Sequence, residues 1–222
     1  MSAVKDAMTL LLNEIEARIL GSLIEKDITT PDYYPLSLNA LVNACNQKNN
    51  REPVMNLGED AVRQGLAALQ EKGLAGPAGG ADSRVTKFEH RLQEVFNFDR
   101  REIAVLGVLL LRGQQTPGEL RTRADRMYHF DALEDVVAAL DRLARRDPPL
   151  VSVLPRQPGT KESRYMQVLS QTAGEYQPPL RPDTLAAAYE GDRLARLEEE
   201  VARLRQEIAE IREELAALKA GG

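Results

Sequence analysis

The spacing of apolar positions predicts two sets of helices that follow the same order along the chain. A helically spaced apolar run contains Leu20-Gly21 and recurs with Leu106-Gly107, and Thr30-Pro31 recurs as Thr116-Pro117, both at an offset of 86 residues. A later helical run recurs at an offset of 74, where Val62, Leu66 and Leu69 match Val136, Leu140 and Leu143. Because four features keep the same order, the pattern indicates an internal duplication. The smaller second offset predicts about twelve extra residues in the first repeat, between its second and third helices.

A turn rich in Gly and Pro, flanked by alternating residues, follows the third helix of each repeat and is typical of a β-hairpin. The turn runs are GPAGGADS, followed by RVTKFEH, and PRQPGTKES, followed by RYMQVL. Helix, Thr-Pro turn, helix, helix and hairpin is the order of a winged-helix domain. The sequence therefore predicts a mainly α fold with small β-hairpins (α+β), built from two tandem winged-helix domains over residues 13–93 and 97–170.

The C-terminal part of the chain has a different pattern. Residues 171–184 are rich in proline and predict a stiffened linker, and residues 185–220 predict a helix. Within it, over residues 193–219, apolar residues alternate at spacings of three and four, which is typical of a coiled coil and predicts a dimerisation surface. These residues are Leu194, Leu197, Val201, Leu204, Ile208, Ile211, Leu215 and Leu218.

The charges beside this apolar stripe favour a parallel homodimer. In a parallel pair the facing residues are opposite in sign at Arg193–Glu198, Glu200–Arg205, Glu207–Arg212 and Glu214–Lys219. In an overlapped antiparallel pair, two of the four contacts would repel, so the parallel form gains about 2 kcal/mol from exposed pairs. A trimer stays open, because the heptad positions a contain neither the Asn nor the Lys that would specify the number of helices. The other alternative is a helix folded back on its own domains, which would leave the complementary charges unexplained.

Composition excludes several classes of function. With 5% aromatic residues and no tryptophan, the chain is poor material for stacking single-stranded nucleic acid. The net charge of −5 means that any nucleic-acid contact must come from local patches of cations. Apolar runs are far shorter than a membrane span, and the single Cys45 fits a reducing compartment, so we expect a cytoplasmic protein without a membrane partner.

A search for catalytic groups in the sequence gives no constellation. His90 and His129 lack metal-ligand spacing, and the run GPAGGADS precedes a strand, where a phosphate-binding loop would precede a helix. Glu59-Asp60 and Glu134-Asp135 stand at predicted helix starts, where carboxylates stabilise the helix dipole. We therefore expect a protein that is not an enzyme, with no catalytic residue, metal or cofactor.

Two groups of residues are of the type that contacts duplex DNA. The insertion over residues 43–56 is rich in amide side chains that can read base edges, although a hydrogen-bonded connector between helices explains it equally well. Cations on the two hairpins and after the second Thr-Pro turn could hold phosphates. The candidate set is Lys48, Arg51, Arg84, Lys87, Arg121, Arg123, Arg126, Lys161 and Arg164.

The third helix of each repeat, which would read the groove, begins with carboxylates that would meet phosphates unfavourably. The fold and the clustered cations predict a non-enzymatic duplex-DNA-binding protein of transcription-regulator type, dimerised by the parallel coiled coil. The alternative, favoured by the acidic helix starts and the near-neutral charge, is a protein-interaction scaffold that uses the same fold without nucleic acid. A protein partner would meet an apolar or amide-rich patch near Tyr33, Tyr34 or Met55.

Four long stretches of this sequence resemble the YceH-like family of uncharacterised bacterial proteins. They are TTPDYYPLSLNALVNACNQKNNREPVMNL, RVTKFEHR, LLLRGQQTPGELRTRADRMY and PGTKESRYMQVL. The resemblance covers about residues 13–170 and implies a tandem winged-helix fold. It implies no activity, substrate or catalytic residue, and it does not extend to the predicted coiled coil.

Overall fold

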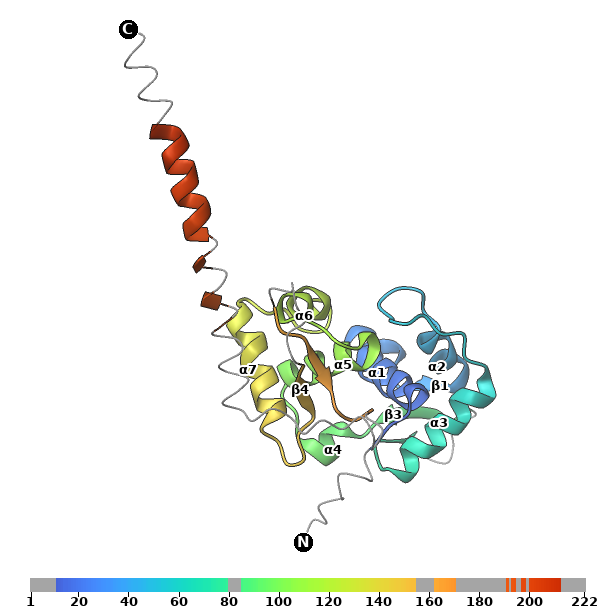
Figure 1. The fold of residues 1–222 in the computed structure, drawn as a ribbon. Helices are drawn as coiled ribbons and strands as arrows, with labels where there is room; N and C mark the ends of the chain where they lie inside the picture. Colours follow the sequence, from blue (N-terminus) through green and yellow to red (C-terminus); the bar gives the residue numbers. More distant parts are fainter. Residues whose placement is uncertain are drawn as a thin grey trace.

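The computed structural model describes residues 11–79, 85–154, 162–170, 191, 193–194, 197–198 and 200–212, and it is mainly helical with small antiparallel sheets (Figure 1). This agrees with the α+β class expected from the sequence. The first repeat contains α1 (Glu14–Thr29), the 3-10 helix η2 (Pro31–Tyr33), β1 (Leu36–Ser37), α2 (Leu38–Cys45), α3 (Glu59–Glu71), β2 (Ala75–Ala78) and β3 (Lys87–His90).

The second repeat follows a short connecting helix, α4 (Leu92–Phe96). It contains α5 (Arg100–Arg112), α6 (Pro117–Ala124), α7 (Leu133–Ala144), β4 (Val151–Val153) and β5 (Tyr165–Gln167). The first sheet has the order β1-β3-β2, and the second consists of β4 and β5. A single bridge between Gln115 and Tyr165 stands where β1 pairs with β3 in the first repeat, so both repeats have three helices and a hairpin in the same order.

The first helix of each repeat begins with a capping box at equivalent positions. The N-cap side chains of Asn13 and Asp99 accept the backbone N–H groups of Glu16 and Glu102 at 2.9 and 2.8 Å, and each glutamate accepts the N-cap N–H in return. The two caps are 86 residues apart, which is the offset of the first duplicated motifs. The same local chemistry therefore starts both first helices.

The capping glutamates also fasten the third helix to the first. Glu16 forms an ion pair with Lys72 at the end of α3, and Glu102 forms one with Arg146 just beyond α7, at 3.0 Å. Lys72 and Arg146 are 74 residues apart, which is the offset of the third-helix motifs. One ion pair thus occupies the same place in both repeats, and this supports the duplication independently of the apolar pattern.

The apolar residues that define the repeats form one core across both of them. The aligned residues on the first and third helices are all buried, at most 7% exposed, namely Ile19, Leu20, Leu23, Ile24, Val105, Leu106, Leu109, Leu110, Val62, Leu66, Leu69, Val136, Leu140 and Leu143. They belong to a single cluster that also includes residues of both hairpins. The repeats therefore share a core instead of packing as separate globules.

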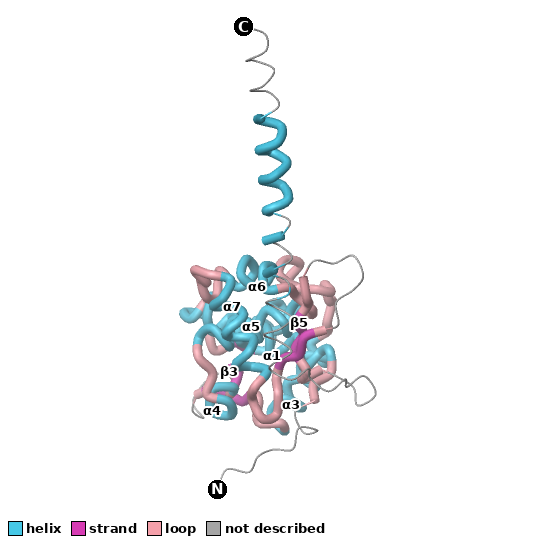
Figure 2. The backbone as a smooth tube through the Cα atoms, turned by 60° about the vertical axis from the view of Figure 1, so that its left-hand side comes forward, coloured by secondary structure: helices cyan, strands magenta, loops and turns pink. Residues whose placement is uncertain are grey.

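The two repeats meet where α1 crosses α5, at the centre of the body in Figures 1 and 2. A Cβ atom on Gly21 would lie 3.1 Å from Cβ of Leu110, and a Cβ atom on Gly107 would lie 3.1 Å from Cγ2 of Ile24. Gly107 matches Gly21, and Leu110 matches Ile24, at the offset of 86 residues, so each contact is the reciprocal of the other. This is the arrangement of a two-fold interface, here formed within one chain.

The extra residues of the first repeat are divided between two places, which corrects the expectation that they all lie between its second and third helices. Residues 46–58 separate α2 from α3, against residues 125–132 between α6 and α7, so this connection is five residues longer. The other seven lie before α2, where η2 and β1 intervene. Pro31 therefore opens a 3-10 turn, whereas Pro117 opens α6 directly.

The C-terminal helical residues, 200–212, stand apart from the body in Figures 1 and 2. The six described apolar residues of the predicted stripe are 44% to 58% exposed: Leu194, Leu197, Val201, Leu204, Ile208 and Ile211. Leu215, Leu218 and the predicted linker over 171–184 lie outside the described residues. Within the described part of the chain, no helix combines the length and apolar character needed to cross a membrane.

The glycine contacts at the crossing predict that Gly21→Ala destabilises the body. The new methyl group would lie 2.9 Å from Leu111 and force the side chains of Leu110 and Leu111 to move. This movement costs about 1–3 kcal/mol, which exceeds or offsets the gain in helix propensity. Gly118→Ala, on α6, is the matched control because its nearest neighbour is 3.8 Å away. Denaturant unfolding should show Gly21→Ala to be the less stable variant, and equal stability would contradict the close crossing.

Candidate functional site

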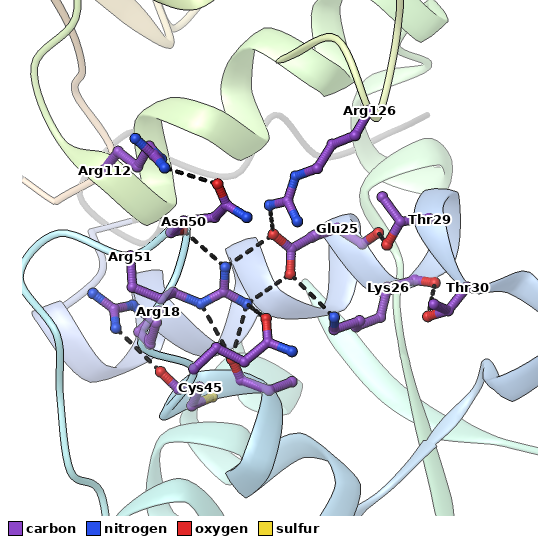
Figure 3. Close-up of polar contacts among 12 residues, drawn as sticks. Arg18, Glu25, Lys26, Thr29, Thr30, Cys45, Asn50, Arg51, Arg112 and Arg126 are labelled. Atoms are coloured by element: carbon purple, nitrogen blue, oxygen red, sulfur yellow. Dashed lines mark hydrogen bonds and ion pairs between the residues drawn. The ribbon is translucent and has the colours of Figure 1, made fainter. Parts of the chain in front are cut away.

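The most concentrated polar feature of the described residues is a buried ion pair between α1 and the connection from α2 to α3 (Figure 3). The guanidinium of Arg51 donates to both carboxylate oxygens of Glu25, at 2.9 and 2.7 Å, and neither side chain is exposed to solvent. Arg51 also donates to the Ala44 carbonyl, at 3.1 Å from Nε and 2.8 Å from Nη2. This single side chain therefore holds the connection against both α1 and α2.

A second buried arginine, Arg18 on α1, reinforces the same connection. It donates to the carbonyl of Cys45 at 3.1 Å and to that of Pro53 at 2.6 Å. The carbonyls of Ala44 and Cys45 belong to the last turn of α2, where backbone acceptors lack helical partners and the helix dipole is negative. Arg18 and Arg51 thus satisfy the C-terminal end of α2 from inside the protein.

Further cations, from both repeats, lie around Glu25 and the connection that Arg51 holds. Arg126, which follows α6, forms an ion pair with Oε1 of Glu25, and Lys26 Nζ lies 3.5 Å from Oε2. Arg112, at the end of α5, donates to the side-chain oxygen of Asn50 at 2.8 Å. We refer to Glu25 and its surrounding cations as the junction cluster, which consists of Arg18, Glu25, Lys26, Arg51, Arg112 and Arg126.

Burial lowers the pKa of every cation in the junction cluster. Removal from water lowers the pKa of Arg51 to about 10, so its guanidinium stays charged at neutral pH. Burial, and then repulsion from Arg51, lowers the pKa of Arg18 and of Lys26. Burial raises the pKa of the Cys45 thiol, which agrees with a buried apolar cysteine and disfavours a thiolate nucleophile.

The structure places the predicted DNA contacts in different environments. The prediction that Arg51 contacts DNA is wrong. Its side chain is fully buried and paired with Glu25, so in this fold it cannot reach a phosphate. Lys48 and Lys87 are exposed, and neither has an ion-pair partner among the described residues. Arg84 and Lys161 lie outside the described residues.

The remaining candidates hold parts of the second repeat together. Arg121 donates to the carbonyls of Phe130 and Asp131, at 3.2 and 2.7 Å. Arg123 and Arg164 both pair with Glu119 of α6, at 3.6 and 2.9 Å.

The ionisation of Glu119 reflects these contacts. Burial alone would raise the pKa of Glu119, but the Thr116 N–H and the two guanidiniums lower it below its ordinary value. These arginines therefore carry structural contacts, and Arg126 carries one to Glu25.

The first turns of both third helices are acidic, as the sequence indicates. Glu59 and Asp60 open α3, and Glu134 and Asp135 open α7. The nearby cations are partly neutralised, since Arg63 pairs with Glu59, and Arg101 lies 3.3 Å from Asp135. These surfaces are not concentrations of positive charge.

The histidines have carboxylate partners. Nε2 of His90 lies 3.2 Å from Asp27, and Nδ1 of His129 lies 2.6 Å from Asp125. The hydrogen bond and charge of Asp125 raise the pKa of the exposed His129. In the ranges that the structure describes, no three His, Cys, Asp or Glu side chains gather in a way that could hold a metal ion.

The patch suggested for a protein partner is uneven. Tyr33 is 78% exposed, whereas Tyr34 is half-buried and its hydroxyl accepts the backbone N–H of His90 at 2.8 Å. Met55 is also half-buried, and its neighbour Val54 is 56% exposed.

Sequence reasoning missed most of the junction cluster, including Arg18, Glu25, Lys26 and Arg112. A usable signal was present, because Arg18 and Glu25 interrupt the apolar run of the first helix where its neighbours are buried. Charged residues in such a run require partners within the protein. Their partners lie 26 residues or more away along the chain and carry no recognisable motif.

Comparison with known proteins finds a family that covers most of the body. Residues 12–160 match the family described as "Protein of unknown function, DUF480". A UPF0502 protein of Koribacter versatilis is 56% identical over 194 residues, which cover 87% of this chain and 90% of that protein. UPF0502 proteins of Geobacter sulfurreducens and Shewanella piezotolerans are 50% and 45% identical, covering 87% and 86% of this chain and 90% and 92% of theirs.

Removing one partner of the buried ion pair should be far more damaging than removing one partner of an exposed pair. We expect Arg51→Ala to cost about 3–5 kcal/mol, because it leaves the Glu25 carboxylate buried and short of a partner. Arg63→Ala breaks an exposed pair with Glu59 and should cost at most about 0.5 kcal/mol. Urea unfolding of both variants measures the difference, and similar losses would show that the Arg51 pair is not structural.

Proposed function

Since the chain belongs to the DUF480 family and is similar to UPF0502 proteins of Koribacter versatilis and Geobacter sulfurreducens, we propose that it is a non-enzymatic protein-interaction scaffold of two winged-helix domains, dimerised by a parallel coiled coil. One observation carries the proposal. Of the nine candidate DNA contacts, five are engaged inside the fold, while a row of large apolar side chains on the C-terminal helix is left exposed. Among the described residues, the C-terminal helix therefore offers an exposed apolar surface, while most of the described cationic candidates are already held by contacts within the fold.

The winged-helix assignment draws support from the topology of the first repeat. Three helices precede the hairpin of β2 and β3, and β1, between the first and second helices, pairs antiparallel with β3. That three-stranded arrangement, with the hairpin as the wing, is what the helix order predicts. In the second repeat the bridge from Gln115 to Tyr165 takes the place of the first strand.

Dimerisation draws support from the exposure of the C-terminal stripe. An isolated helix that leaves such a stripe in water is marginal, and a second copy would bury it. The charged residues flanking the stripe attract across a parallel pair at Glu200–Arg205 and Glu207–Arg212. A second copy of this chain is therefore the partner of this surface.

The scaffold is favoured over DNA binding by the use that the fold makes of its cations. A groove-reading helix offers cations or amides at its N-terminal end, whereas α3 and α7 offer carboxylates there. The cationic candidates Arg123 and Arg164 already neutralise Glu119. Contact with phosphates would have to break these ion pairs.

Duplex-DNA binding of the transcription-regulator type is the second candidate, and one observation favours it. Lys48, on the connection between α2 and α3, and Lys87, on the hairpin, are exposed and have no ion-pair partner among the described residues. Connections and wings of this kind are where backbone phosphates would be held.

The coiled coil predicts that Leu204→Asp abolishes self-association. A carboxylate at this core position would be buried in the pair without a partner. Gln206→Asp is the matched control, because its position in the heptad faces away from the partner helix. Light scattering after size-exclusion chromatography should give a dimer mass for the unaltered chain and for Gln206→Asp, and a monomer mass for Leu204→Asp.

Disulfide cross-linking of the variant Val201→Cys tests the orientation of the two helices. Identical core positions face each other in a parallel pair, so the two new thiols should form a disulfide under mild oxidation. The native Cys45 is buried and serves as an internal control in the unaltered chain. A dimer that does not cross-link through residue 201 would contradict the parallel arrangement.

The choice between scaffold and DNA binding rests on salt dependence. On the scaffold proposal, fluorescence anisotropy should detect no saturable binding to a random duplex at about 50 mM salt. If the second candidate is right, binding is present and falls steeply with salt, and Lys48→Ala and Lys87→Ala each lower the slope by about one. Arg145→Ala, which removes an exposed arginine paired with Asp141, is the matched control.

A further inference from the structure

The charges of the junction cluster do not balance among the described residues. Arg51 takes both oxygens of Glu25, and this pair alone neutralises the carboxylate. Arg126 and Lys26 approach the same carboxylate, and within the described ranges the structure gives neither of them another acidic partner. Arg126 and Lys26 are therefore in excess of the single negative charge, as are Arg18 and Arg112, which contact only uncharged oxygens (Figure 3).

The excess of cations around Glu25 is larger than at the other ion pairs of the described residues. The chain has 34 acidic and 29 basic residues, so carboxylates are plentiful. Several partly exposed arginines elsewhere have a carboxylate close by: Arg142 lies 3.0 Å from Asp99, Arg145 lies 2.8 Å from Asp141, and Arg164 lies 2.9 Å from Glu119. Glu119 is shared by two arginines, whereas Glu25 is shared by the three cations Lys26, Arg51 and Arg126.

Holding these cations together costs free energy. Side-chain exposure is 16% for Lys26 and 35% for Arg126, so both have lost much of their hydration. Burial lowers the pKa of both groups, and the charge of Arg51 lowers that of Lys26 further. An anion that contacts both cations from their solvent-accessible side would offset this cost.

We propose that the junction cluster binds a phosphate group of a small anionic ligand through Arg126 and Lys26. A phosphate carries up to two negative charges, which would offset the positive charges of Arg126 and Lys26. Its oxygens suit the donor fork of a guanidinium and the point charge of an ammonium. Arg126 and Lys26 keep solvent access, whereas Arg51 is fully buried and serves to hold Glu25 in place.

The position of this site would link it to the packing of the two repeats. Lys26 lies on α1 of the first repeat, and Arg126 follows α6 of the second. A ligand bridging them would contact both repeats at once and stabilise their arrangement. The proposal does not rest on the scaffold or the coiled coil, because those concern other surfaces.

Titration of the full-length protein with inorganic phosphate tests the proposal directly. We expect saturable binding in calorimetry and a rise in the unfolding temperature, because a ligand that binds the folded state stabilises it. Potassium chloride at matched ionic strength should produce neither effect. Equal effects of chloride and phosphate would show simple screening and would overturn the proposal.

Two variants locate the binding. Arg126→Gln and Lys26→Gln should each weaken phosphate binding about tenfold or more, which is the effect of losing one hydrogen bond to a charged group. Both variants should stay folded, since Arg51 keeps its two contacts with Glu25. Arg145→Gln, which is outside the cluster, is the control and should bind as the unaltered chain does. If Arg126→Gln also binds unchanged, the site is elsewhere and the proposal fails.

A further pair of titrations identifies the source of the phosphate. A nucleoside triphosphate that binds more tightly than inorganic phosphate, and loses this binding in Arg126→Gln, would support a nucleotide-type ligand at this site. A short random duplex that binds while both small ligands fail would overturn the proposal in favour of backbone phosphates. Light scattering on the same samples reports the dimer separately, so loss of phosphate binding and loss of self-association are distinguishable.

Discussion

Gly21 and Gly107 let α1 and α5 approach closely, and this crossing determines the positions of the other elements in the body. Each glycine faces an aliphatic side chain of the opposite helix, and the two contacts are reciprocal. The third helices are then fixed to the first helices by equivalent ion pairs, Glu16–Lys72 and Glu102–Arg146. A shared apolar core and a repeated pair of charges thus build both halves around one central contact.

The cations of this acidic chain are used first to hold the fold together. Arg18 and Arg51 satisfy the end of α2, and Arg123 and Arg164 converge on Glu119 of α6. A positive side chain in this fold is therefore a weak guide to nucleic-acid binding unless its partners are known. The exposed apolar stripe of the C-terminal helix is a stronger indication of function, because nothing in the described body covers it.

The sequence predicted the repeated helices well because each one carries its own local signals. The offsets of 86 and 74 located the first and third helices, and the aligned apolar residues are buried as expected. The division of the extra residues was wrong because β1 has two residues, too few for an alternating pattern. The burial of Arg51 could not be predicted from its neighbours, since its partner Glu25 lies 26 residues away on another helix. The coiled coil remains a prediction, because its core requires a second chain.

The reciprocal crossing has a consequence for what the two halves can become. If a single repeat associated with an identical copy, every side chain of the interface would occur twice, once on each side of the two-fold axis. Joining the repeats covalently removes that requirement, and the residue equivalent to Glu25 at the offset of 86 is Leu111. The acidic side chain is thus present once, with its cations on one side, while the other side keeps an aliphatic contact against Gly21. Covalent fusion has broken the symmetry of the interface and left room for a chemically distinct site on one side of it.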